Sequence, residues 1–100
     1  MKFGEVIKNA REHQQIPQKV LAAALNVDTP MYSRIERGER PAKREQVITI
    51  AQCLKIDSQE LIRIWMADKV FQIIKEEDDI TGILNSIAEV VETNMSDCNE

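Results

Sequence analysis

Five basic residues crowd into eleven positions near the middle of the chain, opposed there by only two acidic residues. The basic residues are Arg34, Arg37, Arg40, Lys43 and Arg44, and the acidic residues are Glu36 and Glu39. Guanidinium and ammonium groups at this density suit the binding of a polyanion through its phosphates. Any one of these charges alone fits a solvated surface residue equally well, so the interpretation depends on their crowding.

No other set of residues has a spacing that suits catalysis or metal binding. His13 is the only histidine, and the two cysteines, Cys53 and Cys98, form no CxxC motif. Zinc sites need ligands at short spacings, and nucleophilic catalysis needs a base beside the nucleophile. We therefore expect no enzyme activity, no metal and no cofactor. The few cysteines, the lack of an apolar leader and the lack of an 18-residue apolar run predict a cytoplasmic protein outside the membrane.

The elements that must position the basic cluster are predicted to be helices, so the expected fold class is all-α. Three glycines, three prolines and four aromatic residues are too few for an all-β chain. Apolar residues recur at spacings of three and four, which is typical of amphipathic helices. We expect helices over residues 3–14, 18–25, 29–37, 43–54 and 58–76, and a sixth that begins at Asp78-Asp79.

The third predicted helix has two different faces. Tyr32 and Ile35 form an apolar stripe, and Asp28 is placed to cap the first turn. The other side carries small, polar and basic residues, namely Thr29, Pro30, Ser33, Arg34 and Arg37. Asn26 tolerates the left-handed backbone that a tight turn before this helix requires. A short helix that is anchored on one side and offers such side chains on the other suits the major groove of DNA.

Residues 3–65 resemble the lambda-repressor-like, or Xre-type, helix-turn-helix family. The matching segments are FGEVIKNAR in the first helix, Gln18 at the start of the second, LAAALNVD across the turn, and YSRIERGERPA at the end of the third. The resemblance implies a five-helix DNA-binding domain that places its third helix in the major groove. It covers about two thirds of the chain, and the rest is similar to C-terminal helical extensions of some bacterial members.

The family pattern, carried over position by position, implies the residues that contact DNA. The residues implied to contact bases are Thr29, Pro30, Met31 and Arg34. Those expected to contact the DNA backbone are Gln18, Ser33, Arg37, Arg40, Lys43 and Arg44. Arg11 and Glu36 match a pair that usually forms an internal salt bridge between the first and third helices. They are expected to be structural.

Two positions depart from the family pattern. Asn26 replaces the usual turn glycine, and Thr29-Pro30 replaces the long or polar residues common at the start of the third helix. Proline cannot form a side-chain hydrogen bond with a base, although it can contact a thymine methyl group. Direct readout is therefore expected to depend heavily on Arg34.

The charge is divided unevenly along the chain. Residues 1–67 contain eleven basic and eight acidic residues, a net +3, whereas residues 68–100 contain two and nine, a net −7. We therefore predict a DNA-binding domain over residues 1–67 and an acidic helical extension over residues 68–100. The extension carries an apolar stripe, for which dimerisation, docking of another protein and a solvated cap are all possible roles. We favour dimerisation through Val70, Ile73, Ile74, Ile80, Ile83, Leu84, Ile87 and Val91.

These observations predict a sequence-specific transcriptional regulator that binds double-stranded DNA as a homodimer at a pseudo-palindromic operator. A repressor or a restriction-modification-type controller fits this size. The alternative is an antitoxin-like protein that binds a partner protein through its C-terminal helices and autoregulates its operon. A third reading is an interaction module that has lost DNA binding. A neighbouring toxin gene would favour the antitoxin, and a neighbouring methyltransferase gene would favour the controller.

Overall fold

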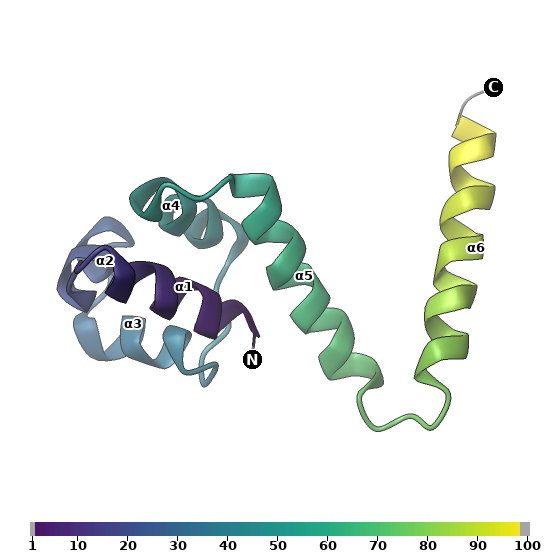
Figure 1. Cartoon of the computed structure of the whole chain (residues 1–100), viewed down its shortest axis with the longest axis horizontal. Helices are drawn as coiled ribbons and strands as arrows, with labels where there is room; N and C mark the ends of the chain where they lie inside the picture. The colour runs from purple at the N-terminus through teal and green to yellow at the C-terminus, as the bar shows by residue number, and fades with distance from the viewer. Residues whose placement is uncertain (1, 99–100) are drawn as a thin grey trace. The chain divides into compact units, whose positions relative to one another are not determined.

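A computed structural model describes residues 2–98, and side chains are described for residues 2–95. Over these residues the chain forms six α-helices and no strand (Figure 1). The helices are α1 (Lys2–His13), α2 (Gln18–Ala24), α3 (Thr29–Glu36), α4 (Arg44–Leu54), α5 (Ser58–Ile74) and α6 (Ile80–Cys98). The all-α class and the order of helices predicted from the sequence are confirmed. Observed ends lie within about two residues of the predicted ones, which is the usual uncertainty of helix boundaries.

The chain divides into two compact units, Met1–Val70 and Phe71–Glu100. The first contains α1 to α4 and most of α5, and the second contains the last residues of α5 together with α6. The predicted domain boundary after Ala67 stays a prediction. The observed division comes three residues later, so Asp68 and Lys69 lie in the first unit.

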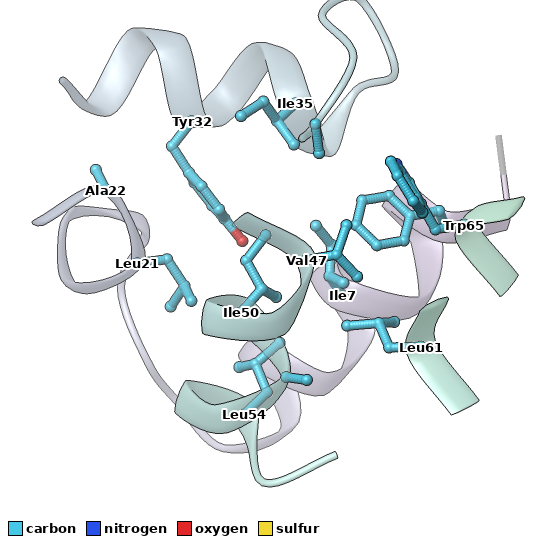
Figure 2. Close-up of a cluster of buried hydrophobic side chains, with 13 residues drawn as sticks. Ile7, Leu21, Ala22, Tyr32, Ile35, Val47, Ile50, Leu54, Leu61 and Trp65 are labelled. Atoms are coloured by element: carbon cyan, nitrogen blue, oxygen red, sulfur yellow. The ribbon is translucent and has the colours of Figure 1, made fainter. Parts of the chain in front are cut away.

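The core of the first unit is built from all five of its helices (Figure 2). Its largest fully buried side chains are Tyr32, Ile7, Leu21, Ile50, Leu54, Leu61 and Val47. Trp65 of α5 closes the cluster and is 7% exposed. Full burial of one such apolar side chain contributes roughly 1.5–3 kcal/mol, so this cluster is the main source of the unit's stability.

The turn between α2 and α3 is defined by two local features. Asn26 has a φ of 58°, the left-handed backbone expected from its type. The Asp28 carboxylate accepts a hydrogen bond from the Met31 amide at 2.8 Å and caps α3. Gly38 follows α3 with a φ of 77°, a conformation that suits glycine at the end of a helix. These features fix the direction in which α3 leaves the turn.

Helix α1 is held at two points by partners that are distant in sequence. The first is a close approach to α3, where a Cβ added at Gly4 would collide with the backbone carbonyl oxygen of Glu36. The second is a buried hydrogen bond of 2.7 Å from the Phe3 amide to the Asp68 carboxylate of α5. This carboxylate satisfies one of the amides that lack a partner at the start of α1. The end of α5 that lies in the first unit is thereby joined to α1.

The second unit contains much less buried apolar surface in its described part. Asp79 caps α6 by accepting the Gly82 amide at 3.1 Å. Ile74 is 8% exposed, whereas the apolar residues along α6 from Leu84 to Met95 are largely exposed. Among the described residues, no helix has both the length and the apolar character needed to span a bilayer.

Candidate nucleic-acid interface

The candidate interface begins with α3, whose two faces differ as the sequence predicts. Tyr32 and Ile35 are 0% and 2% exposed and pack into the core. Thr29, Pro30 and Arg34 are exposed on the other side, and Met31 is half-buried between the two faces. The cap at Asp28 holds the first turn, so the exposed residues project from a helix that cannot rotate about its axis without uncovering Tyr32.

A buried polar network holds α3 against α1. Glu36 lies on the inner side of α3, and its carboxylate accepts two hydrogen bonds from the Arg11 guanidinium, at 2.7 and 3.1 Å. The same guanidinium donates to the Ile16 carbonyl oxygen at 2.9 Å. The side chains of Arg11 and Glu36 are 12% and 2% exposed, so this is a buried ion pair with two parallel bonds. It joins the first helix to the third.

Burial and hydrogen bonding act in opposite directions on the Glu36 carboxyl. Burial raises its pKa, but the hydrogen bonds from Arg11 and the Gln18 amide, together with the positive charge of Arg11, outweigh burial, and the pKa lies below its ordinary value. The hydrogen bonds to Glu36 likewise raise the pKa of Arg11 despite its partial burial. Both groups are therefore charged at neutral pH, and the pair forms a structural link between α1 and α3.

Tyr32 is a core residue whose hydroxyl group is buried together with its ring. Burial, reinforced by the neighbouring Glu36 carboxylate, raises the pKa of the Tyr32 phenol well above its ordinary value, so the group stays protonated. Its oxygen is buried and has no hydrogen-bond partner among the described residues. Tyr32 consequently offers nothing to a ligand at the surface.

Gln18 begins α2 beside this network. Its side-chain amide donates to the Glu36 carboxylate at 3.2 Å, so in the free chain this group faces the network. Gln18 also lines a shallow polar hollow between α1 and α3, together with Ser33 and Arg37. The contact with the DNA backbone implied for Gln18 stays a prediction. A DNA phosphate at this position would compete with the Glu36 carboxylate for the Gln18 side-chain amide.

Ser33 and Arg37 contact each other at the end of α3. The Arg37 guanidinium donates to the Ser33 hydroxyl at 2.7 Å and forms an ion pair with Glu39. Both partners of that ion pair are more than half exposed. Exposed pairs of this kind contribute only about 0–1 kcal/mol, so a stronger anion can readily take the place of Glu39.

The remaining basic residues of the cluster are free of carboxylate partners. Arg34, Arg40, Lys43 and Arg44 are all exposed, and no ion pair among the described residues includes any of them. The Lys43 amide donates to the Gln46 side chain at 2.9 Å, which fixes the start of α4. The loop between α3 and α4 thus presents unneutralised cations next to the exposed face of α3.

Two charged residues of α5, Asp68 and Lys69, make contacts that the sequence did not predict. Lys69 lies over the Trp65 ring with its ammonium nitrogen 3.7 Å from the ring centroid, and Arg44 lies over the same ring at 5.6 Å. The spacing of four between Trp65 and Lys69 is a sequence signal for contact along a helix. Nothing in the sequence signals that Asp68 binds the start of α1, because that contact spans 65 residues.

The described residues contain no group of three or more His, Cys, Asp or Glu side chains that could hold a metal ion. Cys53 is a free, half-buried thiol on α4, and the side chain of Cys98 lies outside the described residues. The charged groups that remain near α3 are suited to binding an anion through hydrogen bonds and Coulomb attraction.

Comparison with known proteins agrees with this geometry. The family model described as helix-turn-helix matches residues 7–61, which is more than half of the chain. The chain therefore belongs to the lambda-repressor-like, or Xre-type, helix-turn-helix family, and it is a DNA-binding regulator of this class and not an enzyme. It is also similar to an uncharacterized HTH-type transcriptional regulator, YqaE, of Bacillus subtilis (strain 168). The two are 28% identical over 83 residues, which cover 83% of this chain and 67% of that protein. No solved structure gives a significant match.

Proposed function

We propose that the chain is a cytoplasmic, homodimeric repressor that inserts α3 into the major groove of a short pseudo-palindromic operator. The observation that carries this proposal is the division of α3 into two faces. The buried network of Arg11 and Glu36 fixes one face, while Arg34 on the other is exposed and has no carboxylate partner among the described residues. Such an arrangement presents a rigid helix with a free guanidinium to the base edges.

Base recognition is proposed for Thr29, Pro30, Met31 and Arg34. Arg34 can donate two parallel hydrogen bonds to O6 and N7 of a guanine, which contributes about 1–3 kcal/mol of discrimination against another base. Thr29 and Pro30 stand exposed at the start of α3 and offer a hydroxyl group and apolar contact with thymine methyl groups. Most hydrogen-bonded readout is therefore assigned to Arg34.

Backbone contact is proposed for the residues that surround this face. They are Gln18, Ser33, Arg37, Arg40, Lys43 and Arg44. Phosphate contacts position the helix without reading sequence, and each one releases counterions from the DNA. Replacing both Lys43 and Arg44 by alanine should weaken binding to all sequences alike and reduce the salt dependence of the affinity.

We propose that the apolar residues at the end of α5 and along α6 form a dimer interface. Val70, Ile73, Leu84, Ile87 and Val91 are exposed, and Ile80 and Ile83 are half-buried. Ile74 is buried within the chain, so it offers the least surface of the predicted set. Large exposed apolar patches are uncommon on monomers and mark interaction surfaces. A two-fold dimer would present two copies of α3 to half-sites about 34 Å, or roughly 10 bp, apart.

A second occupant of the same face is a different protein, as in an antitoxin. A groove along α6 is lined mainly by Ile83, Ile87, Val90 and Val91, with Asp79 at one end. The sequence from residue 76 onward contains no lysine or arginine, so a partner helix with basic flanks would also suit it. The mass of the purified chain separates the two candidates, because only the dimer forms without a partner.

The proposal is tested by selecting bound sequences from a random DNA pool and then measuring affinity across single-base variants of the selected site. Arg34→Ala should flatten the preference at one position of each half-site. Arg63→Ala, an exposed arginine of α5, serves as the matched control and should leave the profile unchanged. An unaltered profile for Arg34→Ala would refute its assignment as the main base reader.

A further inference from the structure

Trp65 lies beneath two exposed cations from different helices. Its ring is 7% exposed, and the Lys69 ammonium nitrogen lies 3.7 Å from the ring centroid. The guanidinium carbon of Arg44, the first residue of α4, lies 5.6 Å from the same point. The face of an aromatic ring attracts cations, so the indole holds both side chains in place. One buried ring therefore organises two charges that are 25 residues apart in sequence.

Neither cation, Arg44 or Lys69, has a carboxylate counterion within the part of the chain that the structure describes. Asp68 adjoins Lys69 in sequence, but its carboxylate is buried and accepts the Phe3 amide at 2.7 Å. Two like charges this close to one ring centroid repel each other, and an anion that contacts both would offset that repulsion. The arrangement thus favours a ligand with concentrated negative charge.

The position of this pair indicates which anion it takes. Arg44 directly follows the loop that carries Arg40 and Lys43, both exposed and without carboxylate partners among the described residues. The cluster is therefore continuous with the surface proposed above to contact the DNA backbone. A guanidinium and an ammonium group that are already ordered lose less side-chain entropy when they bind a phosphate.

We propose that Lys69 and Arg44, held by Trp65, form a clamp for one backbone phosphate of the bound DNA. Lys69 is then a DNA-contacting residue on α5, in addition to the α3 face and the loop before α4. The clamp contacts no base. It extends the stretch of DNA backbone that the protein contacts. This inference rests on the proposed DNA binding, and the experiment below separates the failure of one from the failure of the other.

The test compares Lys69→Gln with Arg63→Gln in the full-length chain, using the selected duplex over a range of salt concentrations. Both residues are exposed on α5, but Arg63 makes neither of the cation–π contacts with Trp65. Each protomer of the proposed dimer loses one phosphate contact, so the salt slope should fall by about 1.8 per dimer, and the affinity deficit of Lys69→Gln should shrink about twelvefold between 50 and 200 mM salt. Arg63→Gln should keep the wild-type slope, and Lys69→Arg should restore it.

Trp65 provides an independent readout because it is the only tryptophan of the chain. Its emission should change when the wild-type protein is saturated with duplex, and the change should be reduced in Lys69→Gln. Wild-type binding with equal slopes for Lys69→Gln and Arg63→Gln, or with unaltered emission, would overturn the clamp alone. If the wild-type protein bound no duplex at any salt concentration, the proposed function itself would fail.

Discussion

The two units of the chain differ in where they place their apolar residues. In the first unit, thirteen apolar residues from five helices and the loop before α4 form a buried core, and the buried carboxylates of Glu36 and Asp68 both accept hydrogen bonds. In the described part of the second unit, Ile74 is buried, while Leu84, Ile87, Val90 and Val91 are exposed. The first unit therefore has its own core and is expected to fold alone, whereas the second exposes an apolar surface that suits a partner.

The charges divide in the same way as the apolar surface. The exposed cations near α3 lie in the first unit, and the acidic residues that follow Lys75 lie in the second. Like-charge repulsion keeps an acidic segment away from DNA, so the two units suit two different ligands. We therefore propose that the first unit contacts DNA and that the second unit mediates assembly.

The largest expected effect comes from deleting residues 71–100. Dimeric binding of two half-sites gains roughly 10²–10⁴-fold over a single domain, so the truncated chain should lose about that factor in operator affinity. Sedimentation should give a monomer, and circular dichroism should still give a folded helical protein. Ending the chain after Val70 keeps Asp68 and its bond to the Phe3 amide.

Cutting instead after Ala67 would confuse the result, because loss of Asp68 would also leave the start of α1 without a partner. Asp68→Ala in the full-length chain is the control for that bond, because alanine has no side-chain acceptor for the Phe3 amide. A truncated protein that still sedimented as a dimer would show that the second unit is not needed for dimerisation.

The next largest effect is expected inside the first unit, at Glu36. Glu36→Ala leaves the buried Arg11 guanidinium without its carboxylate, and breaking a buried pair in this way costs roughly 3–5 kcal/mol of unfolding free energy. Lys8–Glu12 is the matched exposed pair, with its charged atoms 3.9 Å apart and both side chains more than half exposed. Glu12→Gln should change the unfolding free energy by less than about 1 kcal/mol. Denaturant unfolding measures both losses of unfolding free energy. Equal losses in Glu36→Ala and Glu12→Gln would show that the Arg11–Glu36 pair stabilises the fold no more than an exposed pair does.

A smaller effect is expected from a methyl group at Gly4. Gly4→Ala places a Cβ against the Glu36 carbonyl oxygen, and relief of such overpacking typically costs about 1–3 kcal/mol. Gly82→Ala is the comparison change in the second unit, where the added Cβ meets the flexible Asp79 side chain that caps α6. Alanine is the better helix former by about 1 kcal/mol, but displacing the Asp79 cap costs about the same, so Gly82→Ala should change the unfolding free energy by less than about 1 kcal/mol. Thermal unfolding of the two variants should therefore give shifts of different sign or very different size.

The pH dependence of stability sharpens the same contrast. The pKa of Glu36 is lowered in the folded chain, so its contribution is present above the ordinary carboxyl pKa and is lost as the pH falls through the folded value. The difference in unfolding free energy between wild type and Glu36→Gln should be constant near neutral pH. It should narrow when the pH is lowered below 4.5, the ordinary value for this carboxyl. A difference that stayed constant throughout acidification would show that Glu36 contributes no charge to the fold.

Local features of the first unit could be predicted from the sequence. The Asp28 cap, the left-handed Asn26 and the buried stripe of Tyr32 and Ile35 each depend on residue type and short spacing, and the structure contains all of them. The burial of the three alanines of α2 is less predictable. Ala22 is buried whereas Ala23 and Ala24 are exposed, and the three have the same residue type, so only packing distinguishes them.

The features that escaped prediction join residues far apart in the chain. The Asp68 bond to Phe3 and the place of Arg44 over Trp65 depend on how α5 packs against α1 and α4, and no local pattern encodes that packing. The left-handed backbone of Gln15 after α1 could not be predicted either, because glutamine is not a residue type that favours positive φ. The residues of the basic cluster were predictable as a group, but their pairing was not, as the contact between Arg37 and Ser33 illustrates.

The central claim is that α3 reads DNA and that the second unit supplies the second copy. The most direct test is a parallel selection from one random DNA pool with the full-length chain and with residues 1–70. The full-length chain should enrich a two-fold symmetric site whose half-site centres lie about 10 bp apart. The truncated chain should enrich one half-site alone. Enrichment of the same symmetric site by both proteins, or of no sequence by either, would contradict the account.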